Sequence, residues 1–383
     1  MKKILVVAMV DSIHTARWLR QFDQDDFEFV VFPSTPNRRI HPLIRSHKGS
    51  GSRSIIRIPR PMTLGALPLG IIDLFANNFF RAKLLARVIK SAQPDLIHIM
   101  ETQHAGYLAS KALAMVENRP RVALSIWGSD LFWFTRFNAH SKRIRSVLEK
   151  VDLLVCECLR DQKLAREFGF QGLFFSLMPA TGGIDLDRIM SRVDSNPVAQ
   201  RTKVAMKGYS GFVGLGLDAV KVIKRIEKEA ADFSFILYSA GIRTWLVSIF
   251  LQRRMGARLR VVRKHKFTIS EIEEMFLTSK VAVGLSLSDG LPATVKEAMC
   301  FGAFPIQTST SCAAQWFEEG KGGLTVPPGD IEAISETVLK VLFDDDLVQA
   351  GTRDNLKVAN DKFSFAKLND MAHDLYRECI GIS

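Results

Sequence analysis

Short runs of apolar residues alternate with amphipathic segments along the first half of the chain. In the amphipathic segments the apolar residues recur with helical spacing, whereas the runs between them are continuous and only a few residues long. Continuous short runs are typical of strands that are buried on both faces, and strands separated by helices predict a parallel sheet covered on both sides. The expected strands are 3–10, 27–33, 95–100, 121–130 and 151–159, and the expected helices are 11–22, 80–92, 105–116 and 143–150.

The same alternation restarts after a polar stretch around residues 191–203. The chain of 383 residues also exceeds the usual size of one hydrophobic core. The predicted fold class is therefore α/β, with two doubly wound Rossmann-like domains that face each other across a cleft. The predicted segments are a first domain 1–185, a linker 186–202, a second domain 203–360 and a C-terminal helix 361–383 that packs back on the first domain. In such sheets ligands bind at the carboxyl ends of the strands.

The formal net charge of +12 is unevenly distributed. Residues 34–60 contain seven Lys and Arg residues and no Asp or Glu, which indicates a basic loop. Such a loop suits an anionic membrane, a phosphate-bearing substrate or nucleic acid, and a solvated charged surface is the plain alternative. The segment 62–80 is too polar to span a bilayer, so it is either interfacial or a loop before a core helix. Asp11 interrupts the apolar run after Lys2 and Lys3, so we expect no secretory signal and a cytoplasmic location.

The stretch 288–299 places two carboxylates around the start of a predicted helix. A buried strand runs into a tight turn, and Pro292 suits the first helical position. The N–H groups and the dipole at a helix start attract anions, and the hydroxyl of Thr294 adds a donor. Asp289 and Glu297 lie eight residues apart, so they can hold the two ends of one elongated ligand with a diphosphate between them. The alternative is an ordinary helix with acidic residues near its start.

Residues 288–345 resemble the donor-binding region of the family-4 retaining glycosyltransferases, which have the GT-B fold. The family pattern has two carboxylates separated by seven residues; here Asp289 replaces the first Glu, and Glu297 begins the expected Glu-Ala-Met segment. A later family motif is matched by Gly-Leu-Thr-Val-Pro-Pro-Gly-Asp at 323–330, and 182–185 resembles the segment before the family's hinge. The resemblance implies a GT-B fold whose first domain binds the acceptor and whose second domain binds a nucleotide-sugar donor.

The resemblance also implies roles for residues of the stretch 288–299. Asp289 is implied to contact the hydroxyls of the transferred sugar, beside the backbone N–H groups of Gly290 and Leu291. Glu297 is implied to hold the ribose of the nucleotide. The residues around Thr294 are implied to hold the diphosphate.

Family members place an Arg and a Lys after the first strand of this domain, where they neutralise the leaving diphosphate. The usual Gly-Arg pair is missing here, so Lys207 is the predicted catalytic cation. Lys203 and Lys221 are the less favoured substitutes. Arg243 and Arg263, at later strand ends, are predicted to complete the positive charge or to frame the base.

Polar and aromatic residues at strand ends of the first domain are candidates for acceptor binding. Trp127 stands where many relatives have a His, so it is predicted to stack on a sugar face. Asp130 is a predicted catalytic group near the acceptor, and the alternative is that its side chain only caps a loop. For His14 the alternative to acceptor binding is a helix-capping or surface role. His98 is expected to be a buried core residue. The predicted acceptor-binding residues are Ser12, His14, Glu101, His104 and Trp127.

No group of His, Cys and Asp residues has the spacing of a metal site. We therefore expect a reaction without metal or cofactor, in which the helix dipole and a lysine stabilise the leaving diphosphate. The leading hypothesis is a retaining glycosyltransferase of the hexosyltransferase class, acting on a saccharide or lipid-linked acceptor in cell-envelope polysaccharide or lipopolysaccharide synthesis at the inner face of the cytoplasmic membrane. A nucleotide-sugar epimerase or a phosphorylase on the same fold is the alternative. A binder of nucleic acid or anionic surfaces is disfavoured because basic and aromatic residues are not interleaved, so no nucleic-acid partner is expected.

Overall fold

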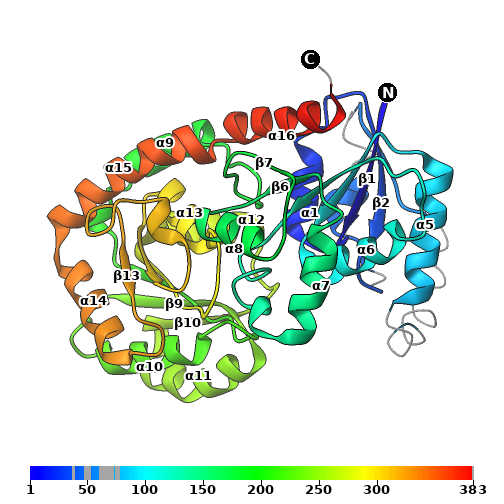
Figure 1. Ribbon diagram of the computed structural model, residues 1–383. Coiled ribbons are helices and arrows are strands. Elements are labelled where there is room, and N and C mark those ends of the chain that lie inside the picture. Colours follow the sequence, from blue (N-terminus) through cyan, green and yellow to red (C-terminus); the bar gives the residue numbers. More distant parts are fainter. Residues whose placement is uncertain (37–38, 47–52, 60–72, 74–77, 382–383) are drawn as a thin grey trace. The chain divides into compact units, whose positions relative to one another are not determined.

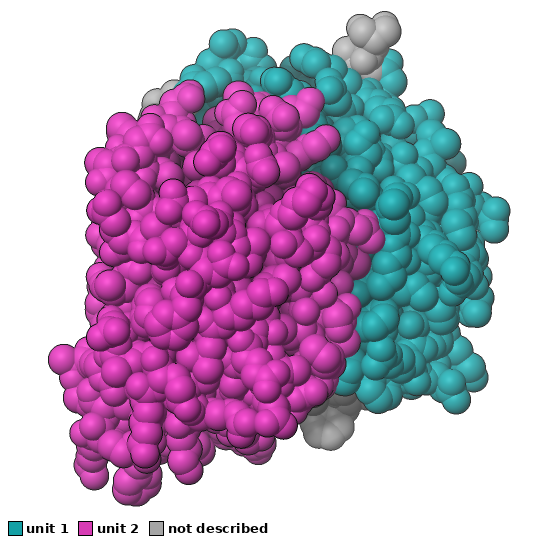
Figure 2. All heavy atoms as spheres, turned by 90° about the vertical axis from the view of Figure 1, so that its left-hand side faces the viewer, with its two compact units in different colours: residues 1–182, 368–383 teal, residues 183–367 magenta. Residues whose placement is uncertain are grey.

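The chain forms two compact units in the computed structural model, which describes residues 1–36, 39–46, 53–59, 73 and 78–381. Unit 1 consists of Met1–Gly182 and Leu368–Ser383, and unit 2 consists of Gly183–Lys367 (Figure 2). Each unit has its own parallel sheet and its own hydrophobic core.

The sheet of unit 1 has seven parallel strands in the order β3-β2-β1-β4-β5-β6-β7. Alternate residues of β1 enter two different cores, since Leu5 and Val7 pack with α5, α6 and α7, whereas Ile4 and Val6 pack with α1 and α16. The sheet is therefore covered on both faces (Figure 1), as the continuous apolar runs predict. The strands are β1 (Lys2–Ala8), β2 (Phe27–Pro33), β3 (Ile55–Arg57), β4 (Leu96–Met100), β5 (Arg121–Ser125), β6 (Leu153–Val155) and β7 (Leu173–Phe174). The helices and turns are α1 (Ile13–Arg20), α2 (Pro42–Arg45), α5 (Phe79–Ala92), the π-helical turn η2 (Thr102–Gly106), α6 (Tyr107–Leu113), η3 (Phe134–Arg136), α7 (Asn138–Leu148), α8 (Leu159–Glu167) and α16 (Phe365–Ile380).

Helix α16 completes unit 1 through a buried chain of hydrogen bonds. The hydroxyl of Tyr376 accepts a bond of 2.8 Å from the indole N–H of Trp18 and lies 3.1 Å from Nδ1 of His98. The other ring nitrogen of His98, Nε2, lies 2.8 Å from the hydroxyl of Ser125, so both ring nitrogens have partners in the core. Burial lowers the pKa of His98 to about 3, so the ring is neutral, and His98 is a core residue as expected.

Unit 2 repeats the same topology with six parallel strands in the order β10-β9-β8-β11-β12-β13. Its main core lies between the sheet and α10, α11 and α14. The strands are β8 (Lys203–Lys207), β9 (Ser234–Ala240), β10 (Leu259–Arg263), β11 (Ser279–Gly284), β12 (Phe304–Thr308) and β13 (Leu324–Val326). The helices and turns are α9 (Asp187–Asp194), η4 (Val198–Gln200), α10 (Gly216–Ile226), α11 (Ile242–Met255), η5 (Gly256–Arg258), α12 (Ile269–Thr278), α13 (Ala293–Phe301), η6 (Ala313–Gln315), α14 (Ile331–Phe343) and α15 (Asp345–Phe363).

The structure bears on three segments predicted from the sequence: the linker 186–202, the basic stretch 34–60 and the segment 62–80. Residues 186–202, the predicted linker, fold as α9 and η4 within unit 2, where Ile189 and Val193 of α9 are buried. Part of the basic stretch 34–60 is described, and there Arg53 pairs with an Asp and Arg57 with a Glu. Most of the segment 62–80 lies outside the described residues. Among the residues that the structure describes, no helix combines the length and the apolar character needed to cross a bilayer.

Candidate active site

The two sheets each have one point where the strand order reverses, and ligands of doubly wound sheets bind at the carboxyl ends of the strands there. In unit 2 this point lies between β8 and β11, which end at Lys207 and Gly284. In unit 1 it lies between β1 and β4, which end at Ala8 and Met100. Most of the predicted site residues follow one of these four strand ends or the end of the neighbouring strand β5.

The loop after β11 is held in place by backbone and hydroxyl contacts. Ser286 donates its N–H to Thr308 over 2.9 Å, and its carbonyl accepts from the hydroxyls of Thr308 and Thr310 at 2.7 and 2.6 Å. Ser286 also forms a bridge with Gly214, so the loop after β8 lies against the loop after β11. The hydroxyls at the end of β12 were not recognised in the sequence, because a threonine in a buried strand gives no sign of which loop it will contact.

Helix α13 follows this loop and is almost entirely buried. It begins at Ala293, one residue later than predicted, with Pro292 in extended conformation as the capping residue. Only Ala293 and Glu297 of its nine residues are partly exposed, and these two share one face because they are four residues apart. Asp289, four residues before Ala293, is also partly exposed. Both predicted carboxylates are therefore accessible in a segment that is otherwise closed.

Two of the predicted donor groups have internal partners in unit 2. The hydroxyl of Thr294 is buried and lies 2.6 Å from the hydroxyl of Tyr238. Burial raises the pKa of Tyr238 far above its usual value. The N–H of Gly290 donates to the carboxylate of Asp289 over 3.0 Å. At α13 the N–H of Val295 donates to the carbonyl of Pro292 over 2.9 Å. The N–H groups of Ala293 and Thr294, rather than the threonine hydroxyl, are therefore the donors that this helix start directs toward an anion.

The predicted cations lie at different distances from α13 along the sheet. Lys207 is the last residue of β8, next to β11, and forms no ion pair with any residue that the structure describes. Lys203 lies at the opposite end of the same strand, away from the site, and the ammonium of Lys221 is paired with Asp218 on α10. Arg263 ends β10, three strands from β11, which is about 14 Å at the usual strand spacing.

Arg243 is the second residue of α11, which follows β9, and its side chain is exposed. Strand β9 is the second strand from β11, so Arg243 is closer to α13 along the sheet than Arg263 but farther than Lys207. The order of the strands thus ranks the cations in a way that the sequence alone does not.

In unit 1, the loops after β1 and β5 meet at an aromatic contact. The ring of His14 packs edge-on against Trp127 with 5.3 Å between the ring centroids. Ser12 caps α1 by accepting the N–H of His14 over 3.1 Å, so the serine hydroxyl has a structural role. His104 lies on η2 with an exposed side chain, and partial desolvation together with the charge of Arg81 lowers its pKa.

Glu101 and Asp130 are buried and point toward backbone N–H groups. Glu101 has a positive φ of 76° and accepts the N–H of His104 at 3.0 Å and that of Ala105. Asp130 accepts the N–H groups of Thr102 at 2.8 Å and Trp127 at 3.0 Å. The geometry supports the loop-capping alternative for Asp130, since its carboxylate fixes the two loops that carry His104 and Trp127 and has no exposed face for an acceptor.

Burial should make the stability of unit 1 depend on pH through Glu101. Burial raises the pKa of this carboxyl to about 7, against the opposing effect of its backbone hydrogen bonds. Below pH 4.5 the folded and unfolded forms both hold the proton; between pH 4.5 and 7 only the folded form does, so stability falls as the pH rises through this window. The expected slope is up to about 1.4 kcal/mol per pH unit. Unfolding of wild type and Glu101→Gln, measured at a series of pH values, should show a flatter slope for the variant; equal slopes would contradict the assignment.

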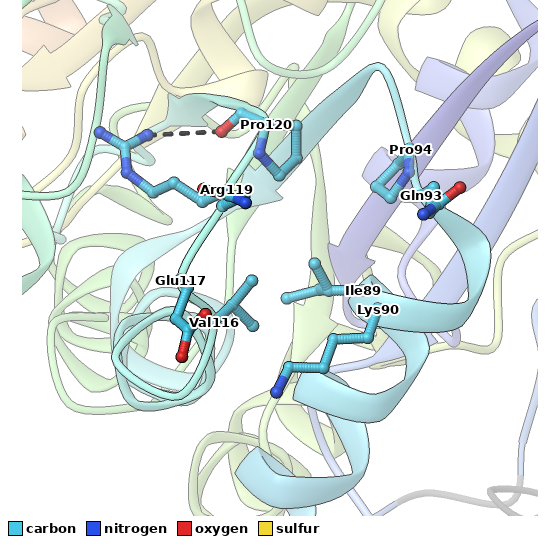
Figure 3. Close-up of a pocket in the computed structure, with 9 residues that line it drawn as sticks. Ile89, Lys90, Gln93, Pro94, Val116, Glu117, Arg119 and Pro120 are labelled. Carbon is cyan, nitrogen blue, oxygen red and sulfur yellow. Dashed lines mark hydrogen bonds between the residues drawn. The ribbon is translucent and has the colours of Figure 1, made fainter.

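Unit 1 also has a pocket on the opposite edge of its sheet, where β4 and β5 begin. The cavity of about 520 Å³ lies between the end of α5 and the loop before β5, with Ile89 and Val116 in its wall and Lys90 and Arg119 at its rim (Figure 3). This edge is away from the carboxyl ends of the strands, so the pocket is separate from the candidate site. No group of three or more His, Cys, Asp or Glu residues within the described part of the chain is arranged to hold a metal ion.

The structure defines two doubly wound α/β units, and the comparisons with known proteins identify the family of the chain. A model described as "glycosyl transferase 4-like" matches residues 3–157, and one described as "glycosyl transferases group 1" matches residues 252–359, which include the loop after β11 and α13. The chain belongs to the family-4-like, group-1 glycosyltransferases. No curated protein matches it in sequence.

Solved structures with the same fold cover the whole chain at low identity. HepE of Anabaena in complex with UDP-glucose has a TM-score of 0.70 at 11% identity, covering 99% of this chain and 100% of its own. The sucrose-phosphate synthase of Thermosynechococcus elongatus has a TM-score of 0.71 at 14% identity, with 100% of both chains covered. A UDP-forming trehalose-phosphate synthase of Burkholderia vietnamiensis has a TM-score of 0.70 at 12% identity, again with 100% of both covered. The predicted GT-B fold is confirmed.

Proposed function

We propose that this glycosyltransferase is a retaining, metal-independent enzyme that moves a sugar from a nucleotide-sugar donor to a saccharide or lipid-linked acceptor. The observation that carries the proposal is the partial exposure of Asp289 and Glu297 in a loop and helix that are otherwise largely buried, at the point where the strand order of unit 2 reverses. The structural relatives crystallised with UDP-glucose and with UDP support a uridine nucleotide as the donor's base and ribose.

In the proposed donor complex, the diphosphate lies at the start of α13, where the first N–H groups and the helix dipole favour negative charge. Glu297 accepts the two ribose hydroxyls, and Asp289 accepts hydroxyls of the transferred sugar. Lys207, beside β11, stabilises the charge that develops on the leaving diphosphate. These groups supply donors and charge that a metal ion supplies in other transferases.

In the proposed transfer step, the bond between the anomeric carbon and the phosphate oxygen breaks as the acceptor oxygen bonds to the same face of that carbon. The proton of the acceptor hydroxyl goes to the departing phosphate oxygen, so no protein base is required. In unit 1, Trp127 offers an apolar ring face to the acceptor sugar and His104 an exposed polar group. Asp130 and Glu101 position the loops that carry them.

The proposed acceptor belongs to cell-envelope polysaccharide or lipopolysaccharide synthesis, at the inner face of the cytoplasmic membrane. The basic composition of residues 34–60 supports this proposal, since a lipid-linked acceptor is presented among anionic head groups.

Incubation of the purified protein with a panel of nucleotide sugars tests the proposed function. A donor present at about 100 times its dissociation constant should stabilise unit 2 by about 2.7 kcal/mol and raise its melting temperature by roughly 5–10 °C. Slow release of the nucleoside diphosphate should accompany it. An epimerase would instead interconvert the donor without releasing nucleotide. Neither stabilisation nor release with any donor would refute the proposal.

A further inference from the structure

Helix α11 of unit 2 exposes several large apolar side chains, which a helix that only covers a sheet would turn toward the sheet. Its buried positions include the small polar residues Thr244 and Ser248, together with Leu251 and Met255. A surface helix usually turns its apolar stripe inward and its polar residues to solvent. Here four large apolar side chains are exposed instead: Ile242 (56%), Leu246 (51%), Val247 (55%) and Phe250 (77%).

These four side chains form one patch. Positions 242, 246 and 250 follow one another at intervals of four residues, so they line one face of the helix over about 12 Å, and Val247 widens that face. Single exposed apolar residues are common on proteins, whereas a row over successive turns indicates an interaction surface. Figure 1 shows α11 beside α10, on one side of the unit-2 sheet.

The apolar row is surrounded by positive charge. Residues 241–266 contain eight Lys and Arg residues and no Asp or Glu. Arg254 pairs with Glu227, and Arg260 lies 3.7 Å from Glu271. The remaining exposed cations form no ion pair with any described residue, although Arg263 and Lys264 lie over the rings of Trp245 and Tyr209. We call the following residues the α11 surface: Ile242, Arg243, Leu246, Val247, Phe250, Arg253, Arg263, Lys264 and Lys266.

The chemistry of the α11 surface distinguishes between possible occupants. Two copies of the chain that met through the same surface would bring their cations together, which like charges oppose. Nucleic acid would pair with the cations but would offer little to a row of aliphatic and aromatic side chains. An anionic lipid surface satisfies both parts, because apolar side chains enter the region below the head groups while flexible Arg and Lys side chains reach the phosphates.

We propose that the α11 surface binds the protein to an anionic membrane. Phe250 and Leu246 enter the head-group region, Ile242 and Val247 contact it at either side, and Arg253 and Lys266 pair with lipid phosphates. This contact lies in unit 2 and is separate from the basic stretch 34–60 of unit 1. It does not require the proposed transfer activity, since binding is measured without substrates.

Vesicle binding by the full-length protein tests the α11 surface. Vesicles of phosphatidylcholine with phosphatidylglycerol should bind the protein, more weakly as salt is added, whereas vesicles of phosphatidylcholine alone should bind it poorly. The double variant Phe250→Ser, Leu246→Ser should weaken binding by roughly tenfold or more. Arg253→Ala should weaken it by about fivefold, and only with anionic vesicles. The fluorescence of Val247→Trp should shift to the blue when anionic vesicles are added.

Leu173→Ser is the matched control, because Leu173 is an equally exposed apolar residue (61%) on β7 of unit 1. It should leave vesicle binding unchanged, and the melting temperatures of all variants should equal that of the wild type because the side chains are exposed. Absence of binding to anionic vesicles, or full binding by the double variant, would overturn the proposal. The proposal would also be overturned if binding were lost only in a double variant of unit 1, Arg53→Ala with Arg57→Ala. A dimer that becomes a monomer in the Phe250→Ser, Leu246→Ser variant would overturn it as well.

Discussion

Glu297→Ala should weaken donor binding, and Asp289→Ala should mainly slow sugar transfer. The two carboxylates are the accessible acids of the loop after β11 and of α13, and they lie at either side of the helix start. A hydrogen bond between a carboxylate and a hydroxyl contributes about 1.5–3 kcal/mol, so removal of Glu297 should raise the donor KM by roughly 10–100-fold with a smaller change in kcat. In the proposed complex Asp289 contacts the sugar that moves, where charge develops, so its removal should lower kcat by about 10²–10³-fold.

Steady-state kinetics with varied donor and acceptor measure these effects, and donor binding to the inactive Asp289→Ala variant separates binding from transfer. Asp289→Asn keeps the shape of the side chain and tests whether the charge is needed. Glu336→Ala is the control, since Glu336 is an exposed carboxylate on α14. If both site variants kept full activity, the site would have to lie elsewhere.

Arg201→Met should destabilise unit 2 by about 3–5 kcal/mol, which lowers its melting temperature by roughly 10 °C. The guanidinium of Arg201 is buried, and the two N–H groups of its Nη1 are shared among the carbonyls of Gly302 at 2.8 Å, Phe301 at 3.1 Å and Ser279 at 3.1 Å. Burial lowers its pKa to about 10, so it is still charged at neutral pH. Methionine fills a similar volume but leaves these buried carbonyls without a donor, and it removes the positive charge from the C-terminal end of α13.

Calorimetric thermal unfolding, which resolves the transitions of the two units, measures this effect, because a chain of two units need not unfold in one step. Arg188→Met is the control from the neighbouring helix α9: Arg188 forms an exposed ion pair with Glu273 and should contribute less than about 1 kcal/mol. Equal losses in the two variants would mean that the carbonyls around Arg201 find other partners.

The alternation of buried strands and helices was sufficient to predict two doubly wound units, because continuous apolar runs of strand length are typical of strands that are covered by helices on both faces. The order of the strands in each sheet could not be predicted from the sequence, and that order decides which of the predicted cations lies near the loop after β11. Lys207 lies next to β11, whereas Arg263, also at a strand end, lies on the edge strand. The polar residues that dominate α9 predict a linker, although Ile189 and Val193 have helical spacing and are buried in the structure.

The inward direction of polar side chains also could not be predicted from the sequence. Asp130 and Glu101 follow strand ends as ligand-binding acids do, but backbone N–H groups that become available only in the folded loops draw them inside. Thr294 has the right position in its helix, yet its partner Tyr238 comes from a strand more than fifty residues earlier. The partial exposure of Asp289 and Glu297 agrees with the prediction from their spacing, which depends on one short segment and on no distant contact, whereas their role in donor binding stays a prediction.

The hydrogen bonds of Tyr376 join residues that are synthesised at very different times. The partners of this residue, Trp18 and His98, are made early, but Tyr376 itself leaves the ribosome after all of unit 2. The apolar face that α16 covers therefore waits uncovered while the second unit is translated and folds. Unit 1, whose first strands are made before unit 2, is therefore completed only after unit 2 has been made.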